Sequence, residues 1–170
     1  MFVDEFGSNL AMTKAYARSP MGQPAIEAIP SKQGENLSVV AALTVGGVKA
    51  EMALSGSIDG IAFETWVALV LVPILLPGQT VFMDNARSHK GDKVRILIEQ
   101  AGCSLVFLPA YSPDLNPIEG AFSKIKGHLK RSKARTTQAL LDAIANAITL
   151  VSASHAQAWI AHAGYKLSRQ

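Results

Sequence analysis

The stretch Thr-Val-Phe-Met-Asp-Asn at residues 80–85 is a short run that favours a β-strand and ends directly on an acid, Asp84. A helical pattern follows at 91–101, and a second strand-like run covers 104–108. This order predicts two parallel strands joined by a crossover helix. Because ligands bind beyond the carboxyl ends of strands in an open α/β sheet, Asp84 is expected to lie at a functional edge.

The residues before this unit predict three further strands. The run Phe-Val at 2–3 leads into Asp4, which we interpret as the end of a strand. Valine-rich runs at 37–45 and 48–54 flank two glycines, 46–47, and predict a hairpin with a two-residue turn. Three strands before the first crossover helix predict a mixed sheet, antiparallel on one side and parallel on the other, covered by helices.

Apolar residues at helical spacing predict the covering helices. These predicted helices cover residues 63–71, 91–101, 118–129, 136–150 and 153–163. The first is expected to end at Pro73, and residues 11–34, which show no clean period, are expected to be irregular. With no linker long enough to separate two units, residues 1–170 are expected to form a single α/β domain with extra C-terminal helices.

Composition limits the class of protein. With 170 residues, 49% of them apolar and 17% charged, the chain can bury a single core. Its one cysteine, Cys103, excludes an internal disulfide, and no cysteine pair is available for a zinc site. The longest apolar run, 66–76, has 11 residues, which is too short to cross a bilayer, and residues 1–7 do not resemble a signal peptide. We therefore expect a cytoplasmic protein that has no membrane partner.

Three acids are candidates for one site: Asp4 and Asp84, each after a strand, and Glu119, in the first turn of the helix that follows 104–108. Carboxylates that are brought together repel one another, and such a cluster is stabilised mainly by binding divalent metal. The pattern predicts Mg²⁺ or Mn²⁺, with two ions serving phosphoryl transfer.

Each acid also has a structural interpretation that the spacing leaves open. Asp84 fits an Asx turn, and Asp4 fits a solvated acid near a terminus. Asn116 fits a helix N-cap, which places Glu119 at the position of a capping-box glutamate.

Two segments resemble the acidic motifs of a known family. Met-Asp-Asn-Ala-Arg-Ser-His-Lys at 83–90 and Leu-Pro-Ala-Tyr-Ser-Pro-Asp-Leu-Asn-Pro-Ile-Glu at 108–119 closely resemble the second and third acidic motifs of DDE transposases. The resemblance is to the mariner-like superfamily and its bacterial insertion-sequence relatives. The 34 residues between Asp84 and Glu119 agree with that family's spacing.

The resemblance extends over essentially the whole chain. Asp4, which a glutamate follows, aligns with the family's first catalytic acid, and segments 16–22 and 163–165 also look like family segments. The likeness implies the ribonuclease-H-like fold, in agreement with the predicted order of elements. It implies a transposase whose three acids hold the metal ions, which cuts DNA at the ends of an insertion sequence and joins the freed 3′ hydroxyl to target DNA. The active complex is expected to be a homodimer.

Further residues inside the motifs are expected to support this chemistry. By the same resemblance, Asn85, His89 and Asn116 are expected to orient ligands or to contact the scissile phosphate. For His89, a histidine at the surface or at a helix start is an equally open interpretation.

A basic run that contains no acid follows Glu119, and its charges are expected to attract DNA phosphates. Its lysines and arginines are Lys124, Lys126, Lys130, Arg131, Lys133 and Arg135. Arg87 and Lys90 are expected to add to the same surface.

The chain also departs from the family. Ala110 replaces a usual proline, and Gly120 is expected to loosen the start of its helix by up to about 1 kcal/mol relative to alanine. No helix-turn-helix region precedes the catalytic motifs, and a first strand of so few residues is expected to pair its neighbours poorly. We therefore expect a split-frame product or a truncated remnant that needs an upstream segment. An inactive remnant that only binds DNA or a partner, and another ribonuclease-H-like nuclease, are the alternatives.

Overall fold

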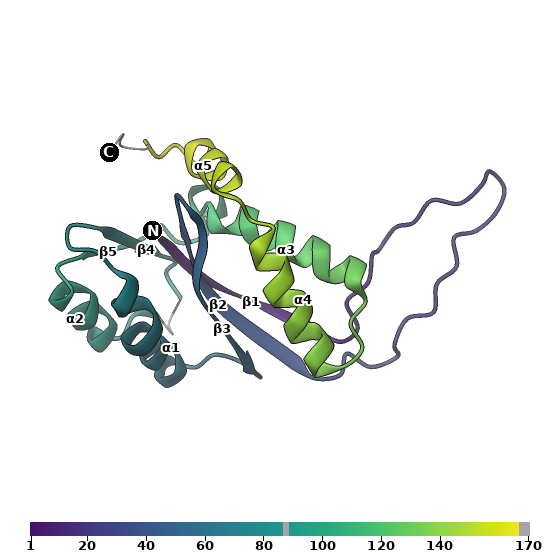
Figure 1. The fold of residues 1–170 in the computed structure, drawn as a ribbon, viewed down its shortest axis with the longest axis horizontal. Coiled ribbons are helices and arrows are strands. Elements are labelled where there is room, and N and C mark those ends of the chain that lie inside the picture. Colours follow the sequence, from purple (N-terminus) through teal and green to yellow (C-terminus); the bar gives the residue numbers. More distant parts are fainter. Residues whose placement is uncertain (87–88, 167–170) are drawn as a thin grey trace.

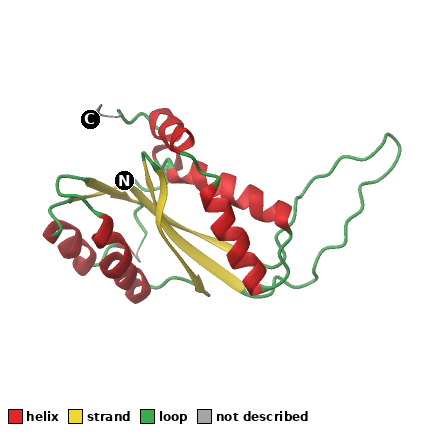
Figure 2. Cartoon of the chain, viewed as in Figure 1, coloured by secondary structure: helices red, strands yellow, loops and turns green. Residues whose placement is uncertain are grey.

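The computed structural model describes residues 1–86 and 89–166, and its centre is a five-stranded mixed sheet with helices on both faces (Figures 1 and 2). The strands are β1 Phe2–Asn9, β2 Asn36–Thr44, β3 Gly47–Ser55, β4 Thr80–Met83 and β5 Ser104–Phe107. Their order in the sheet is β3-β2-β1-β4-β5. β1 pairs antiparallel with β2 and parallel with β4, which confirms the predicted mixed sheet.

The first strand is longer than the sequence indicated. β1 has eight residues and pairs with β2 from Phe2, opposite Leu43, to Asn9, opposite Asn36. The prediction that this strand ends at Asp4 and pairs poorly is therefore wrong for its contact with β2, whereas its contact with β4 is limited to two residue pairs. Its second half contains glycine, serine and asparagine, which β-propensity disfavours, but the hydrogen bonds to β2 hold it extended.

The remaining boundaries agree closely with the predictions. The β2-β3 turn is shifted by one residue, because Thr44 pairs with Gly47 and leaves Val45 and Gly46 as the turn. The first helix does not end at Pro73, which lies in a short 3-10 turn that extends the helix to Ile74.

Helices cover the two faces of the sheet in separate groups, with α1 and α2 on one side and α3, α4 and α5 on the other (Figure 1). They are α1 Gly60–Trp66, continued by the π-helical segment Val67–Leu71 and the 3-10 turn Val72–Ile74, α2 Asp92–Gln100, α3 Ile118–Ser132, α4 Thr137–Thr149 and α5 Ala153–His162. Within the described residues, no single helix is long and apolar enough to cross a membrane.

The alternation of β1 directs Asp4 toward α3. Successive side chains of a strand point to opposite faces of the sheet. Phe2 and Phe6 are buried in the cluster that contains α3, α4 and α5, whereas Val3 is buried in the cluster on the α1-α2 side. Asp4 has the same parity as Phe2 and Phe6, so the sheet places its carboxyl group on the face that the beginning of α3 covers.

A long segment without helix or strand separates β1 from β2. We call residues 13–32 the arm, and Figure 1 shows it projecting far from the body of the domain. Its base is fixed by a hydrogen bond from the Leu10 amide to the Gln33 carbonyl (3.1 Å) and by Arg135, which donates to the Leu10 carbonyl (2.8 Å). The expectation of irregular structure at 11–34 is confirmed.

Gly120 is a packing requirement, which corrects the interpretation of this glycine as a defect in the helix. Gly120 lies in the first turn of α3, where the indole ring of Trp159 in α5 approaches the backbone. A Cβ atom built on Gly120 would lie 2.7–2.8 Å from three ring atoms of Trp159. The glycine therefore allows α5 to pack closely against the beginning of α3, the helix that carries Glu119.

We predict that Gly120→Ala lowers the free energy of unfolding, although alanine is the better helix former by about 1 kcal/mol. The steric overlap with Trp159 outweighs that gain, because overpacking costs about 1–3 kcal/mol. Gly127→Ala in the same helix is the matched control, since a Cβ there meets only Arg131 Nη1, at 3.8 Å, and this variant should be stabilised. Urea unfolding of both variants tests this. A Gly120→Ala protein more stable than the wild type would contradict it, and Trp159→Ala should remove its cost.

Candidate active site

An open pocket of about 400 Å³ lies at the carboxyl ends of the parallel strands. Asp4, Asp84 and Glu119 all line it, together with Asn85 and Asn116. The opposite wall is the turn-rich segment 108–113 between β5 and α3. The structure therefore brings the three predicted acids, which are distant in the sequence, to one cavity.

The register of the sheet explains why the two aspartates meet. Val3 of β1 pairs with Met83 of β4, and this is the last pair between the two strands. Asp4 and Asp84 are the next residues on each chain, so they lie side by side where β1 and β4 separate. Because neighbouring residues of a parallel pair project from the same face, both carboxyl groups can reach the pocket.

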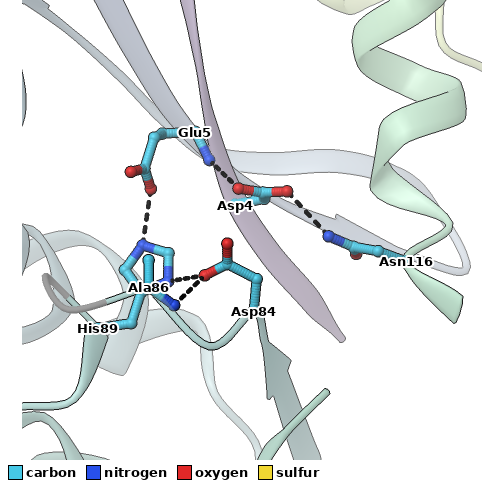
Figure 3. Close-up of polar contacts among 6 residues, drawn as sticks. All are labelled: Asp4, Glu5, Asp84, Ala86, His89 and Asn116. Atoms are coloured by element: carbon cyan, nitrogen blue, oxygen red, sulfur yellow. Dashed lines mark hydrogen bonds and ion pairs between the residues drawn. The ribbon is translucent and has the colours of Figure 1, made fainter. Parts of the chain in front are cut away.

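Asp4 is held from two sides and is buried, with 8% of its surface exposed. Its Oδ1 atom accepts a hydrogen bond from the Glu5 amide (2.7 Å), and its Oδ2 atom accepts one from Asn116 Nδ2 (2.8 Å; Figure 3). Burial, together with the charges of Asp84, Glu119 and Glu5, raises the pKa of Asp4 to about 7, although the hydrogen bond from the Glu5 amide opposes the shift. The pocket thus concentrates negative charge, and no lysine, arginine or histidine of the described residues forms an ion pair with Asp4.

His89 connects Asp84 to Glu5 and is fully buried, so its interpretation as a surface histidine is wrong. Its Nδ1 atom forms an ion pair with Asp84 Oδ1 (2.5 Å), and its Nε2 atom forms one with Glu5 Oε2 (2.6 Å; Figure 3). Burial alone would lower the pKa of His89, but the hydrogen bonds to Asp84 and Glu5 outweigh burial and raise it to about 9. The imidazolium ring packs against the Phe63 ring in a tilted arrangement, with ring centroids 4.2 Å apart and an interplanar angle of 30°.

Asp84 forms the Asx turn that the sequence left open, and its side chain also lines the pocket. Its Oδ1 atom accepts a hydrogen bond from the Ala86 amide (3.0 Å), which is the predicted Asx turn. The hydrogen bond from His89 lowers the pKa of Asp84, against its partial burial. With Oδ1 occupied in this way, the second oxygen of Asp84 points toward Asp4 (Figure 3).

Asn116 is not the N-cap of α3. Pro117 occupies the cap position, and the Asn116 side chain donates to Asp4 instead. Asn116 is buried, and its Oδ1 atom has no hydrogen-bond partner in the described parts of the chain. An unpartnered, buried amide oxygen in an acidic pocket is a strong acceptor for a cation or for water.

Glu119 lies in the first turn of α3 and is exposed, as is Asn85. In residues 1–86 and 89–166, no three His, Cys, Asp or Glu side chains stand in the arrangement of a formed metal centre. The donor set nevertheless fits a hard divalent cation, because it consists of carboxylate and amide oxygens with excess negative charge.

The predicted basic surface is less continuous than its sequence suggests. Lys133 and Arg135 lie beyond the end of α3 and contact the arm and its base: Lys133 pairs with Glu27 of the arm, and Arg135 donates to the carbonyls of Leu10 and Met12 at its base. Lys124 contacts His155 of α5 (3.0 Å). Lys126 lies over the Phe6 ring at 5.6 Å, while Lys130 and Arg131 are exposed near the end of the helix. The sequence could not show which of these charges have partners within the domain. Lys90 is exposed, and Arg87 lies outside the described residues.

Two side chains of the site were missed. Glu5 contacts His89 across 84 positions, and no local sequence signal predicts a contact of that kind. Tyr165, in the closing Ala-Gly-Tyr, donates a hydrogen bond from its hydroxyl to the Leu115 carbonyl (2.9 Å) and packs on Phe2, with ring centroids 4.7 Å apart. It thereby fixes the turn that leads to Asn116.

Comparison with known proteins identifies the class. The family described as DDE superfamily endonuclease matches residues 1–141, and the chain belongs to this family. No curated protein matches the sequence significantly.

Solved structures establish the fold. The chain is similar to the Mos1 transposase paired-end complex with left transposon end, at 18% identity with a TM-score of 0.79, over 94% of this chain and 50% of that one. It is similar to the Mos1 mariner paired end complex with Mn at 18% identity and a TM-score of 0.74, over 98% of this chain and 56% of that one. It is also similar to the Mos1 transposase catalytic domain with Raltegravir and Mg, at 14% identity and a TM-score of 0.64, over 98% of this chain and 84% of that one. The predicted ribonuclease-H-like fold is confirmed, and the chain spans about half the length of the Mos1 chains in the paired-end complexes.

The pKa shifts predict how stability depends on pH in the absence of metal. The pKa of Asp4 rises on folding from 3.8 to about 7, so Asp4 destabilises the folded state increasingly as the pH rises across that interval. The histidine contributes stability that is complete below pH 6.5 and is lost as pH rises through about 9. Both effects have the same sign, so the free energy of unfolding should fall between about pH 4 and 9, with Asp4 accounting for up to about 4 kcal/mol.

Asp4→Asn should remove the decrease between about pH 4 and 7 and leave the part due to His89. Urea unfolding in EDTA over a pH series measures this. Identical pH profiles for the wild type and Asp4→Asn would contradict the assignment, and Mg²⁺ should stabilise the wild type most at high pH.

Proposed function

We propose that this chain is the catalytic domain of a transposase that uses divalent metal to cut DNA and to join it to a target. The observation that carries the proposal is the convergence of Asp4, Asp84 and Glu119 on one pocket in a chain of the DDE endonuclease family. We further propose that residues 1–170 form a single catalytic domain.

In this proposal Asp4, Asp84 and Glu119 hold two ions, and Asn116 Oδ1 adds an oxygen donor beside Asp4. Bound Mg²⁺ or Mn²⁺ would activate the attacking oxygen and stabilise the leaving oxygen of a phosphodiester. The imidazolium of His89 fixes Asp84 Oδ1, so that the second oxygen stays directed into the pocket. Asn85, exposed at the pocket edge, is placed to contact the scissile phosphate.

The substrates we propose are transposon ends and target DNA. Solved neighbours include Mos1 complexes with a transposon end and a Mos1 strand transfer complex, and this likeness supports DNA as the substrate. Lys130 and Arg131, which are exposed on α3 beyond Glu119, are proposed to bind the DNA backbone. We propose that recognition of specific ends depends on a helix-turn-helix segment upstream of the catalytic domain.

Replacement of the pocket acids should abolish metal-dependent cleavage. Asp84→Asn and Glu119→Gln should each reduce the Mg²⁺-dependent nicking rate at least about 100-fold, because charge stabilisation by the ions is lost. Asp114→Asn is the matched control, since Asp114 is an exposed acid on the 3-10 turn before Asn116 and does not line the pocket.

The assay uses a supercoiled plasmid, for which specific ends are not required, and follows conversion to the nicked form with Mg²⁺, Mn²⁺ or EDTA. Nicking that persists in Glu119→Gln would overturn the assignment of that residue. A wild-type protein that binds DNA but never nicks it would favour the inactive remnant.

We also propose that the active complex is a homodimer in which the arm binds the second copy. Four large apolar side chains of the arm are exposed: Tyr16 (91%), Met21 (101%), Ile26 (87%) and Ile29 (65%). Several large apolar side chains exposed on one projecting segment indicate an interaction surface. The projection of the arm from the domain allows it to reach a partner (Figure 1).

Met21→Ser combined with Ile26→Ser should shift the protein–DNA complex from two protein copies to one. Light scattering coupled to size exclusion measures the protein mass in the complex, which should fall from about 36 kDa to about 18 kDa, that is, from two chain masses of 18.0 kDa to one. Leu69→Ser, at a 70% exposed site outside the arm, is the control. A double variant that retains two copies would contradict the role of the arm.

A further inference from the structure

The pocket wall opposite the carboxylates carries an unusual tyrosine. Tyr111 lies in the turn between β5 and α3 and lines the pocket. Its side chain is fully exposed (103%), and its backbone has a φ of 59°. That left-handed conformation is disfavoured for residues with a Cβ atom, and it is rare for bulky side chains.

Exposure and strain at the same residue point to a ligand. Among the exposed large apolar side chains of the described residues, Tyr111 alone lines the acidic pocket. Within residues 1–86 and 89–166, the Tyr111 ring pairs with no other aromatic ring, and its hydroxyl group forms no hydrogen bond. Strained conformations that a protein retains are concentrated at functional sites, where the strain holds a group in position for a ligand.

The charge of the pocket shows why an aromatic ring would be useful there. Asp4, Asp84 and Glu119 repel the phosphates of a nucleic acid strand until cations bind. Base stacking on an aromatic side chain is independent of that repulsion and tolerates every sequence, since each base has a π-face. A tyrosine at the rim can therefore hold a strand where electrostatic attraction is weakest.

We propose that Tyr111 stacks on a base adjacent to the phosphodiester in the carboxylate pocket and thereby positions the DNA strand for cleavage. This proposal rests on the proposed function, because it assumes that a DNA strand enters this pocket. Pro109 and Pro113 flank the turn and restrict the backbone that carries Tyr111. Tyr111 is thus a DNA-positioning residue that acts through its ring and not through its hydroxyl.

The first experiment measures binding without cleavage. The probe is a single-stranded oligonucleotide with 5-iododeoxyuridine in place of thymidine, bound to the full chain in Ca²⁺, and its dissociation constant is measured by fluorescence anisotropy. Tyr111→Ala should weaken binding about 5- to 150-fold, the range expected for the loss of one base–aromatic stack, whereas Tyr111→Phe should bind like the wild type. Leu76→Ala, at an exposed apolar site outside the pocket, is the control. Photocrosslinking should place the modified base on the peptide that contains Tyr111.

A second variant separates positioning from stability. Tyr111→Gly relieves the left-handed backbone and should be at least as stable as the wild type, yet it should bind as weakly as Tyr111→Ala. In the Mg²⁺ nicking assay, Tyr111→Ala should raise the KM for DNA more than it lowers kcat.

Equal binding and equal crosslinking by the wild type and Tyr111→Ala would overturn the stacking proposal. That result would not affect the proposed nicking function. Loss of activity in Tyr111→Phe would overturn it in favour of a role for the hydroxyl. A wild-type protein without Mg²⁺-dependent nicking would instead overturn the proposed function. The binding experiment in Ca²⁺ can still be read in that case, because it does not depend on cleavage.

Discussion

The confinement of the Asp4 carboxyl group at the centre of the sheet is the constraint on which the site depends. β1 is the middle strand, and its register with β4 places Asp4 beside Asp84 where the two strands separate. The carboxyl group is buried, and its pKa is raised to about 7, mainly by burial and with contributions from three neighbouring acids. A fold that retains such an unfavourable charge in its core has a use for a cation that neutralises it.

Two sets of contacts keep this charge cluster in place. On the α1-α2 side, His89 bridges Glu5 and Asp84 and packs against Phe63. On the other side, Asn116 donates to Asp4 at the point where the chain enters α3. The second set depends on distant packing, because the Tyr165 hydroxyl fixes the preceding turn and Gly120 lets Trp159 pack against the first turn of α3. Residues at the end of the described chain thus help to position Asn116 and Glu119.

The sequence predicted the sheet, the helices and the three acids because hydrophobic periodicity and motif spacing are local signals. It did not predict the contacts that join those elements. Asn116 satisfied the local rule for a helix cap, yet its side chain bonds to Asp4, 112 positions away. The length of β1 depended on pairing with β2, which outweighed the weak strand propensity of its second half. Likewise, the basic residues form one run in the sequence, but in the fold Lys133 contacts the arm and Arg135 contacts its base.

The central claim is that Asp4, Asp84 and Glu119 share divalent metal. Anomalous diffraction from crystals of the full chain grown with Mn²⁺ tests it most directly, because manganese is located independently of any assumption about its ligands. The account predicts anomalous peaks in the pocket, with oxygens of all three acids coordinated and the exposed Glu119 side chain turned inward. Manganese bound elsewhere, or a filled pocket from which Glu119 remains withdrawn, would contradict it.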